Sequence, residues 1–563
     1  MTEWLLPIVI IYFVSMSISY RLRNSLIDGD FAALHYPGYF RAKGLISADT
    51  FRKELIGDLG NKTFVQYLNY YLYKILGSEV SKVRQFYGLW AATTGALLFV
   101  LIGYLTGDAI SGLLGGLSFT AWAHHPQMFA HYESAERFAL FHSLLHLGCV
   151  LVAVHSHSPL WAIAAAFIFM PMPFLHKPVY FLEAPIAFSV LLLWGPPWSV
   201  ICYIMTMITG LGILFVIIDS RIKNQIFAPL INLQSGFFVY ALGHFKNLSR
   251  GLILKKLRHY SFQIIPRLFL PAIPAFLVLL QEPKHPEILS VLIFMLGALV
   301  LILCQMRFHP YQYLPLILPL SMFMGLAWQW SLLSWTKPLQ LIALLALYGD
   351  LILFLRLMPT NLNQRIWSSA PHYLNRNEAA PYVAKILKAR TKQNEPVLVW
   401  GDTPQIYLYA DRPSSYPYLE IFPEVFSQYP NKRHLFFKYI SEKPPGYIAV
   451  MMNNVNWQAL YEQTGLRYRQ IDAVHCHDEW FPIYGIDDRQ PYGFVDQRRT
   501  NIEEQFSSSS LQGVGQTPQS LLFSTNLFIE CLCPTENRKI FNPMRSKENT
   551  DPNPTVWNPE MYQ

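Results

Sequence analysis

Long apolar runs constrain this chain more than any other feature of its sequence. Residues 4–20, 86–107 and 198–218 contain no charged side chain. At a rise of 1.5 Å per residue, helices of this length cross the hydrocarbon core of a bilayer, which is about 30 Å thick. Only 14 % of the residues are charged, whereas about a quarter are charged in soluble proteins. We therefore predict an α-helical polytopic membrane protein.

The apolar segments predict about eleven spanning helices in the first 360 residues. We place them at residues 4–20, 86–106, 109–124, 138–155, 159–175, 177–194, 197–218, 264–281, 287–305, 311–329 and 337–357. A further segment, residues 62–77, is short and rich in Tyr, which favours a helix lying at the membrane surface. The first helix lacks a basic leader and a cleavage site, so we expect it to be retained.

Eleven spans would put the N-terminus and the end of the chain on opposite sides of the membrane. The loops 21–85 and 219–263 and the turns near residues 124–137, 176–177 and 307–310 would share the side of the C-terminal domain. Loop 219–263 carries seven lysines and arginines, which by the positive-inside rule favours a cytoplasmic location. Cations gathered around an anionic ligand would give the same bias, so the orientation stays open.

After the apolar region the sequence predicts a small α/β domain. A helical pattern near residues 381–391 is followed by two buried-strand patterns, VLVWGD from Val397 and YIAVMM from Tyr447. We divide the chain into a transmembrane domain (1–357), a soluble domain (358–487) and a tail (488–563). The tail is rich in Ser, Pro, Asn and Gln, which predicts disorder, although residues 521–533 are apolar.

Two carboxylates, Asp28 and Asp30, follow the first apolar helix with Gly29 between them. A carboxylate at the membrane surface can act as a general base or hold a divalent cation. An Asp–Gly turn that leads into a helix N-terminus would use the same residues. The spacing alone leaves both interpretations open.

Four more stretches place ionisable side chains beside apolar helices. Lysine and arginine at such positions also serve as snorkelling or anchoring residues, but ionisable residues at membrane depth are usually functional. The stretches are DLGNKTFVQYLNYYLYKILG with Lys62, HYESAERFALFHSLL with Glu133 and Glu136, FLHKPVYFLEAPIAF with Lys177, and MRFHPYQYLPLILPL with Arg307, His309 and Tyr313.

The order of these motifs resembles that of the GT-C superfamily of polytopic membrane glycosyltransferases, in particular its dolichyl-phosphate-mannose protein mannosyltransferase and aminoarabinose transferase-like family. The resemblance covers residues 1–485, and Asn61 and Thr63 depart from the family's pattern around Lys62. It implies catalytic roles for Asp28, Asp30 and Glu136. It implies substrate binding by Lys62, Glu133, Lys177, Arg307, His309 and Tyr313.

The resemblance also implies a reaction and a location. A sugar would pass from a polyprenyl-phosphate donor to a hydroxyl of a lipid, glycan or protein acceptor on the extracytoplasmic face, in a bacterial inner membrane. Lys177 and Arg307 would stabilise the phosphate leaving group, and Asp28 or Asp30 would take the acceptor proton. A transporter or lipid flippase, or a catalytically silent scaffold, are the alternatives, and no internal repeat of the kind common in transporters is evident.

We predict no metal site and no nucleic-acid partner. His124, His125 and His131 lie near Glu133, but histidines in an interfacial turn explain them better. The sequence HCHDE from His475 has metal-binding residue types in a spacing that matches no standard site. A divalent cation held by carboxylates remains an option, and no other cofactor is expected. The net charge of +8 is spread over loops rather than gathered in one block.

Overall fold

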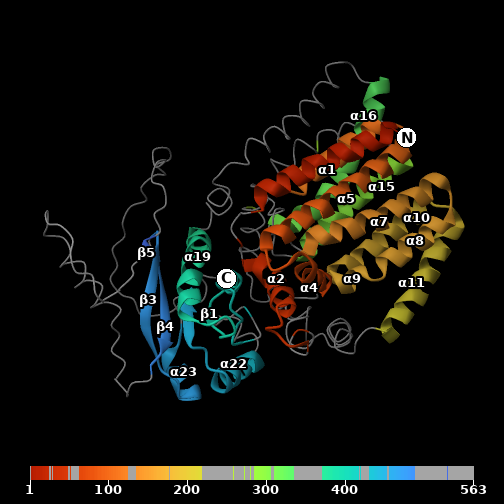
Figure 1. Ribbon diagram of the computed structural model, residues 1–563. Helices are drawn as coiled ribbons and strands as arrows, with labels where there is room; N and C mark the ends of the chain where they lie inside the picture. The colour runs from red at the N-terminus through yellow and green to blue at the C-terminus, as the bar shows by residue number, and fades with distance from the viewer. Residues whose placement is uncertain are drawn as a thin grey trace, which may run out of the picture. The chain divides into compact units, whose positions relative to one another are not determined.

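The computed structural model describes most of two compact units (Figure 1). The helical unit lies within residues 1–377, and the sheet unit lies within residues 378–536. This combination of apolar helices and a small sheet confirms the predicted fold class. The described residues are 2–23, 27, 29–48, 51, 63–124, 135–176, 178–217, 258, 272, 279, 285–305, 310–334, 371–416, 419, 430–452, 455–477, 479–487 and 529–530.

Among its described residues the helical unit has five helices long and apolar enough to cross a membrane: α1, α5, α7, α11 and α15. The predicted spans at residues 264–281 and 337–357 lie outside the described residues except for Ala272 and Leu279, so the number eleven stays a prediction. The elements are α1 (Thr2–Leu22), α2 (Gly29–Ala42), α4 (Thr63–Leu76), α5 (Val80–Thr106), α6 (Ala109–Trp122), α7 (Ala135–Ser156), α8 (Pro159–Phe169), α9 (Met172–Leu175), η3 (Pro178–Leu182), α10 (Glu183–Trp194), α11 (Pro197–Ile217), α15 (Pro286–Gln305), η4 (Pro310–Leu316) and α16 (Ile317–Ser334).

Three predicted spans are not single helices. Residues 159–175 form α8 and α9 with a turn at Met170 and Pro171 between them, and η3 and η4 precede α10 and α16. Proline lacks the N–H that a continuing helix needs. Pro171 stands at the turn between α8 and α9, while Pro178 and Pro310 are the first residues of η3 and η4, so proline accounts for the division of the first of these apolar runs.

Helix α4 matches the segment that we predicted to lie at the membrane surface. Its 14 residues rise about 21 Å, which is less than the thickness of a hydrocarbon core. Val65, Asn69 and Tyr73 form its buried face, while Tyr71 and Lys74 are exposed. The helix is therefore amphipathic, and it packs against α2, α5 and α9.

Helices α1, α5 and α6 pack closely. Ser15 Oγ donates to the carbonyl of Gly88 at 2.6 Å, and Ser19 Oγ donates to that of Arg84 at 3.1 Å, so α1 and α5 are antiparallel. Between α5 and α6 two glycines meet: a Cβ on Gly116 would lie 2.7 Å from the carbonyl oxygen of Gly95. Small residues let helices approach in this way inside membranes.

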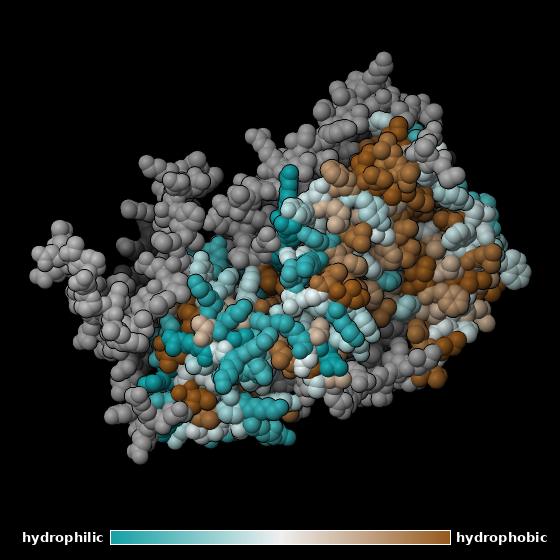
Figure 2. Space-filling model, in the orientation of Figure 1, coloured by the Kyte–Doolittle hydropathy of each residue, from teal (hydrophilic) through white to brown (hydrophobic). Residues whose placement is uncertain are grey.

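The outer surface of the helical unit is apolar. Figure 2 shows it as a broad brown area, and the exposed side chains include Leu5 and Phe13 of α1, Leu160 of α8, Val216 of α11 and Val300 of α15. A soluble monomer rarely exposes so much contiguous apolar surface. Contact with lipid explains this apolar surface. A helix can face lipid because its backbone polar groups are hydrogen-bonded within the helix.

The sheet unit confirms the two predicted strands. Its five-stranded sheet has the order β1-β2-β4-β3-β5; β1–β2 and β3–β5 are parallel pairs, and the other two pairs are antiparallel. The elements are α19 (Pro371–Arg390, of which the larger part lies in this unit), β1 (Leu398–Trp400), α20 (Gln405–Ala410), α22 (Pro430–Glu442), β2 (Tyr447–Val450), α23 (Trp457–Thr464), β3 (Tyr468–Cys476), β4 (Glu479–Ile486) and β5 (Ile529–Glu530).

The predicted start of the first helix in this region, near Pro381, is wrong. Helix α19 begins at Pro371 and contains Pro381. Ala379, Ala380 and Val383 are fully buried beside it, so burial of this face outweighs the hydrogen bond that the proline cannot make.

The C-terminal tail is described only at β5, which pairs with β3 through Val474↔Ile529 and His475↔Glu530. This short strand lies in the apolar stretch 521–533 that interrupts the predicted disordered region. The rest of residues 488–563 and the predicted boundary at residues 357–358 lie outside the described residues, so both stay predictions.

The contact between α5 and α6 predicts the effect of Gly116→Ala. The added methyl group would meet the backbone of Gly95, and overpacking of this kind costs about 1–3 kcal/mol. The variant should melt at a lower temperature in detergent than the parent protein. Gly212→Ala in α11 is the matched control, because a Cβ there meets nothing within 4 Å; equal melting of the two variants would contradict the close packing.

Candidate functional site

Buried polar side chains gather where the first half of α7 meets the turn at residues 176–183. Ser143 Oγ of α7 donates to Glu183 Oε1 at 2.5 Å. His146 Nδ1, one turn later, lies 3.1 Å from Glu183 Oε2, and its Nε2 lies 3.0 Å from the Tyr203 hydroxyl of α11. The Glu183 carboxylate is thus buried with two hydrogen-bond donors, as a carboxylate inside a helix bundle requires.

Two histidines lie against each other at the same place. His176 Nε2 is 2.9 Å from His142 Nδ1, and the Phe64 ring of α4 packs edge-on against both. Burial, and the neighbouring His142, hold the pKa of His176 well below its usual value. A neutral His176 shares one N–H with His142 and keeps its other ring nitrogen for another partner.

Glu136 and Tyr180 extend this cluster toward the start of α7. Both are about 1 % exposed, and Tyr180 lies within electrostatic range of Glu136 and Glu183. Within the described part of the chain, the Tyr180 hydroxyl and His176 Nδ1 are buried without a hydrogen-bond partner. Such groups are rare in folded proteins and mark places where a ligand, water or ion binds.

A small cavity of about 20 Å³ opens beside Ser143 and Glu183. Its other walls are apolar and include Leu140, Phe294 and Leu318. A polar void of this size holds about one water molecule. The cavity therefore fits a water that bonds to Glu183 rather than a sugar.

A second buried network holds α2 onto α4 and α5. His35 Nδ1 lies 2.6 Å from the Tyr73 hydroxyl, and its ring stacks on Phe31 at 3.8 Å. Tyr87 donates its hydroxyl proton to Asn69 Oδ1, while Asn69 Nδ2 donates to the carbonyl of Leu34 at 3.0 Å. Burial, followed by the positive charge of Arg84, holds the pKa of His35 well below its usual value.

His124 belongs to a third network, which accounts for its place in the turn. Arg137 Nη2 donates to His124 Nδ1 at 3.0 Å, so His124 Nε2 carries the proton and donates to Ser15 Oγ at 2.9 Å. Ser15 in turn donates to the carbonyl of Gly88. The end of α6, the start of α7 and the last turns of α1 are joined in this way.

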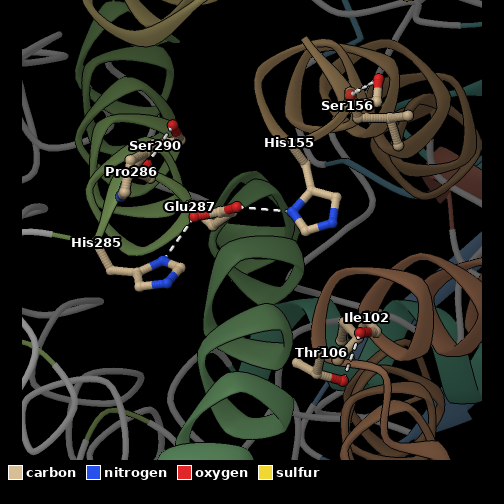
Figure 3. Close-up of polar contacts among 9 residues, drawn as sticks. Ile102, Thr106, His155, Ser156, His285, Pro286, Glu287 and Ser290 are labelled. Carbon is tan, nitrogen blue, oxygen red and sulfur yellow. Dashed lines mark hydrogen bonds and ion pairs between the residues drawn. The ribbon is translucent and has the colours of Figure 1, made fainter.

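One polar cluster lies at the other end of the bundle. Figure 3 shows Glu287, at the start of α15, between His155 of α7 and His285. Glu287 Oε1 is 2.8 Å from His155 Nδ1, and Oε2 is 2.6 Å from His285 Nδ1. The cluster joins the end of α7 to the start of α15. At the opposite ends of these two helices, Ala139 and Leu301 belong to one apolar cluster, so α7 and α15 are antiparallel.

The structure describes three of the nine predicted site residues. Glu136 is buried in the cluster just described. The backbone of Asp30 lies in the first turn of α2, and Tyr313 of η4 is 4 % exposed within the main apolar core. The roles given to all nine stay predictions, and those outside the described residues are Asp28, Lys62, Glu133, Lys177, Arg307 and His309.

Comparison with known proteins gives a match in structure only. No protein-family model matches the sequence, and no curated protein does. The structure of ArnT from Cupriavidus metallidurans, solved with undecaprenyl phosphate bound, matches 86 % of this chain and 98 % of its own at a TM-score of 0.50 and 13 % identity. The chain shares the fold of that structure, which is the fold that the resemblance to the GT-C superfamily implies.

A second match is to the arabinofuranosyltransferase AftD from Mycobacteria. It covers 86 % of this chain but only 40 % of AftD, at a TM-score of 0.46 and 15 % identity. The GT-C resemblance that was read from the order of the motifs is confirmed, at the level of fold alone, by the match to ArnT.

The sequence analysis did not name four of the polar residues of this cluster as site residues: Glu183, His142, His146 and Tyr180. A signal was present, because Glu183 stands in an otherwise apolar stretch, and an ionisable residue at membrane depth is usually functional. His142 and His146 are four residues apart and therefore lie on one face of α7. Their partners on other helices could not be read from spacing.

The network around Glu183 predicts that Glu183→Ala destabilises the protein. Ser143 and His146 would lose their shared acceptor, and each buried donor left without one costs about 1–3 kcal/mol. The melting temperature in detergent should fall clearly. The matched control is Glu79→Ala, since Glu79 is exposed and forms a surface ion pair with Lys82; a similar loss in both variants would contradict the network.

The lowered pKa of His35 predicts a pH dependence. Its folded pKa lies below the unfolded value of about 6.5, so protonation favours the unfolded chain and stability falls as the pH drops below 6.5. One such group contributes a slope of at most about 1.4 kcal/mol per pH unit. His35→Gln should flatten the dependence of the melting temperature between pH 7 and pH 5, whereas a change at the exposed His434 should not.

Proposed function

We propose that this chain transfers a sugar from a polyprenyl-phosphate donor to an acceptor hydroxyl at the membrane surface. The observation that supports this most is the match of fold to ArnT, a structure that contains undecaprenyl phosphate. The order of acidic and basic motifs along the sequence supports the same conclusion independently. Lipid, glycan and protein hydroxyls are all acceptors compatible with this reading.

The turn at residues 176–183 is the proposed place for the donor phosphate. Lys177 follows His176 directly in the sequence, and the His176 ring is held by His142. His176 Nδ1 and the Tyr180 hydroxyl are buried with their hydrogen-bonding capacity unused by the described residues. A cation next to such groups favours an anionic oxygen, and Arg307 is the proposed second cation.

The proposed base is Asp28 or Asp30. It would remove the acceptor proton as the hydroxyl oxygen attacks the anomeric carbon and the lipid phosphate leaves, so a single displacement would invert that carbon. The His35 network supports this role, because it anchors the helix whose first turn contains Asp30. Glu136 would position the acceptor or a divalent cation, and Lys62, Glu133, His309 and Tyr313 would contribute to substrate binding.

The location follows from the same proposal. The chain would be a multi-pass protein of a bacterial inner membrane, in contact with its lipids, and its soluble domain would lie outside the cytoplasm. The cations of loop 219–263 would then serve the anionic donor rather than fix the loop in the cytoplasm.

A transporter is the second candidate, and one observation favours it. Ser143, Glu183, His146 and Tyr203 form a connected chain of hydrogen bonds inside the bundle, which is the kind of network that carries protons in transporters. Purified protein in liposomes separates the two functions. A glycosyltransferase forms glycosylated product from a polyprenyl-phosphate sugar, whereas a transporter moves its substrate without forming any.

The proposed base predicts the behaviour of Asp28→Asn and Asp30→Asn. Asn keeps the size of the side chain but cannot take a proton, so turnover of a polyprenyl-phosphate sugar should fall by roughly 10²–10⁴-fold in one of the two variants. Binding of the donor should barely change.

Asp108→Asn is the control for this experiment. Asp108 caps α6 by accepting from the backbone of Ser111 at 2.8 Å, and Asn is an equally good cap. If Asp28→Asn and Asp30→Asn are both as active as Asp108→Asn, the carboxylates merely begin a helix and the base is wrongly assigned.

The proposed phosphate partner predicts a different effect for Lys177→Met. The phosphate is present in the ground state and in the transition state, so loss of the cation should weaken donor binding at least as much as it slows turnover. Lys74→Met on the exposed side of α4 is the control. Unchanged binding of undecaprenyl phosphate by Lys177→Met, measured by displacement of a labelled lipid, would remove Lys177 from the site.

A further inference from the structure

Three metal-binding side chains, one of them about a hundred residues from the other two, meet in the sheet unit. They are Glu378 of α19, Cys476 at the end of β3 and His477 in the following turn. Their ligand atoms all lie within 4.8 Å of one another. His477 Nε2 is 2.6 Å from Glu378 Oε2, and the Cys476 side chain is fully buried.

Helix α19 is held along the β3–β4 hairpin at two points. Arg390 Nη2 is 2.9 Å from Asp472 Oδ2 near one end, and Glu378 meets His477 at the other. The 12 residues from Glu378 to Arg390 rise about 18 Å in a helix, and the five from Asp472 to His477 span about 17 Å in a strand. The two lengths agree, so Glu378 is fixed at the tip of the hairpin.

The turn explains how two neighbouring residues reach the same point. Successive side chains of a strand point to opposite faces, so Cys476 and His477 would diverge if β3 continued. Cys476 pairs with Glu479, which leaves His477 in a two-residue turn, and its φ is +55°. Two-residue hairpin turns require this left-handed conformation, and it brings His477 round to the side of Cys476 and Glu378.

The adjacent His475 has a different partner. It lies opposite Trp480 in the β3–β4 ladder, with the ring centroids 4.5 Å apart. The stretch HCHDE thus supplies Cys476 and His477 to the cluster, while its third partner, Glu378, lies about a hundred residues earlier in the chain. This is why the spacing within the stretch matches no standard site.

The geometry points to a metal site made of Glu378, Cys476 and His477, which takes a borderline divalent transition metal such as Zn²⁺. Zinc binds thiolate, imidazole and carboxylate together, commonly through three protein ligands with a fourth position left to water. A thiolate, a carboxylate and a neutral imidazole balance its charge. His477 and Glu378 are 26 % and 17 % exposed, which gives an ion access from solvent.

Binding needs only a small movement. Bond lengths to zinc place tetrahedral ligands roughly 3.3–3.6 Å apart. The His477 nitrogen and the Glu378 oxygen, now in hydrogen-bond contact at 2.6 Å, would move apart by less than about 1 Å, and Cys476 Sγ, within 4.8 Å of both, would move closer by at most about 1.2 Å. The metal would then replace the Glu378–His477 ion pair as one of the links between α19 and the hairpin.

Equilibrium dialysis tests the site. The full-length protein in detergent is stripped with a chelator, dialysed against Zn²⁺ and analysed for bound metal. Glu378→Gln, Cys476→Ser and His477→Asn should each lose one equivalent of tightly held zinc. Glu462→Gln, Cys304→Ser and His434→Asn remove the same groups from exposed positions and should retain it.

Two further measurements distinguish a metal site from a plain ion pair: the absorption spectrum with Co²⁺ and the melting temperature with Zn²⁺. Co²⁺ should give a thiolate-to-metal charge-transfer band that Cys476→Ser lacks. Zn²⁺ should raise the melting temperature of the parent protein but not that of His477→Asn, whose new side chain tolerates the left-handed turn and so keeps the fold.

The three variants test the metal site separately. If buried Cys476→Ser fails to fold, His477→Asn and Glu378→Gln still decide the matter. Zinc retention by both of these, no band with Co²⁺, or no zinc on the parent protein would each overturn the site and leave a hydrogen-bonded Glu–His pair.

Discussion

Lipid offers no hydrogen-bond partner, and this constraint governs which helices of the helical unit can be neighbours. A polar group buried there without a partner costs several kcal/mol. Glu183 therefore faces Ser143 and His146 of α7, and His124 faces Ser15 and Arg137. Each of these bonds crosses between helices. The apolar runs place the helices in the membrane, but the polar pairs fix how α1, α6, α7, α10 and α11 lie against one another.

The same constraint makes buried polar atoms without a hydrogen-bond partner informative. In the described part of the helical unit, the Tyr180 hydroxyl and His176 Nδ1 are buried without a partner, and in the sequence these two residues stand on either side of Lys177. Other buried side chains of that part, Ser199 and Ser321 among them, also have an oxygen without a partner, but neither stands next to a lysine in the sequence. Orphaned groups next to a lysine fit a ligand with anionic oxygens better than a defect of packing, which is why the donor phosphate is placed at this turn.

The sequence predicted the elements better than their partners. Apolar runs and alternating strands are local patterns, so the spans of α1, α5 and α7 and the strands after Val397 and Tyr447 could be read directly. The predicted helix start near Pro381 was wrong because burial of the residues around Pro381 stabilises a helix that begins earlier. The candidate site was only half predictable: Glu136 stands in a recognisable motif, but the pairing of His142 with His176 depends on how two helices pack.

The cluster of Glu378, Cys476 and His477 in the sheet unit is the clearest case of partners that sequence spacing could not predict. Cys476 and His477 are adjacent, yet strand alternation would separate them, and only the left-handed φ of His477 unites them. Glu378 becomes a partner only because α19 runs the length of the hairpin. If a metal binds there, it acts on the stability of the sheet unit, whereas the proposed base and phosphate partners all belong to the helical unit. His477→Asn and the Asp→Asn substitutions should therefore have separable effects, so the glycosyltransferase proposal and the metal-site proposal can be tested independently.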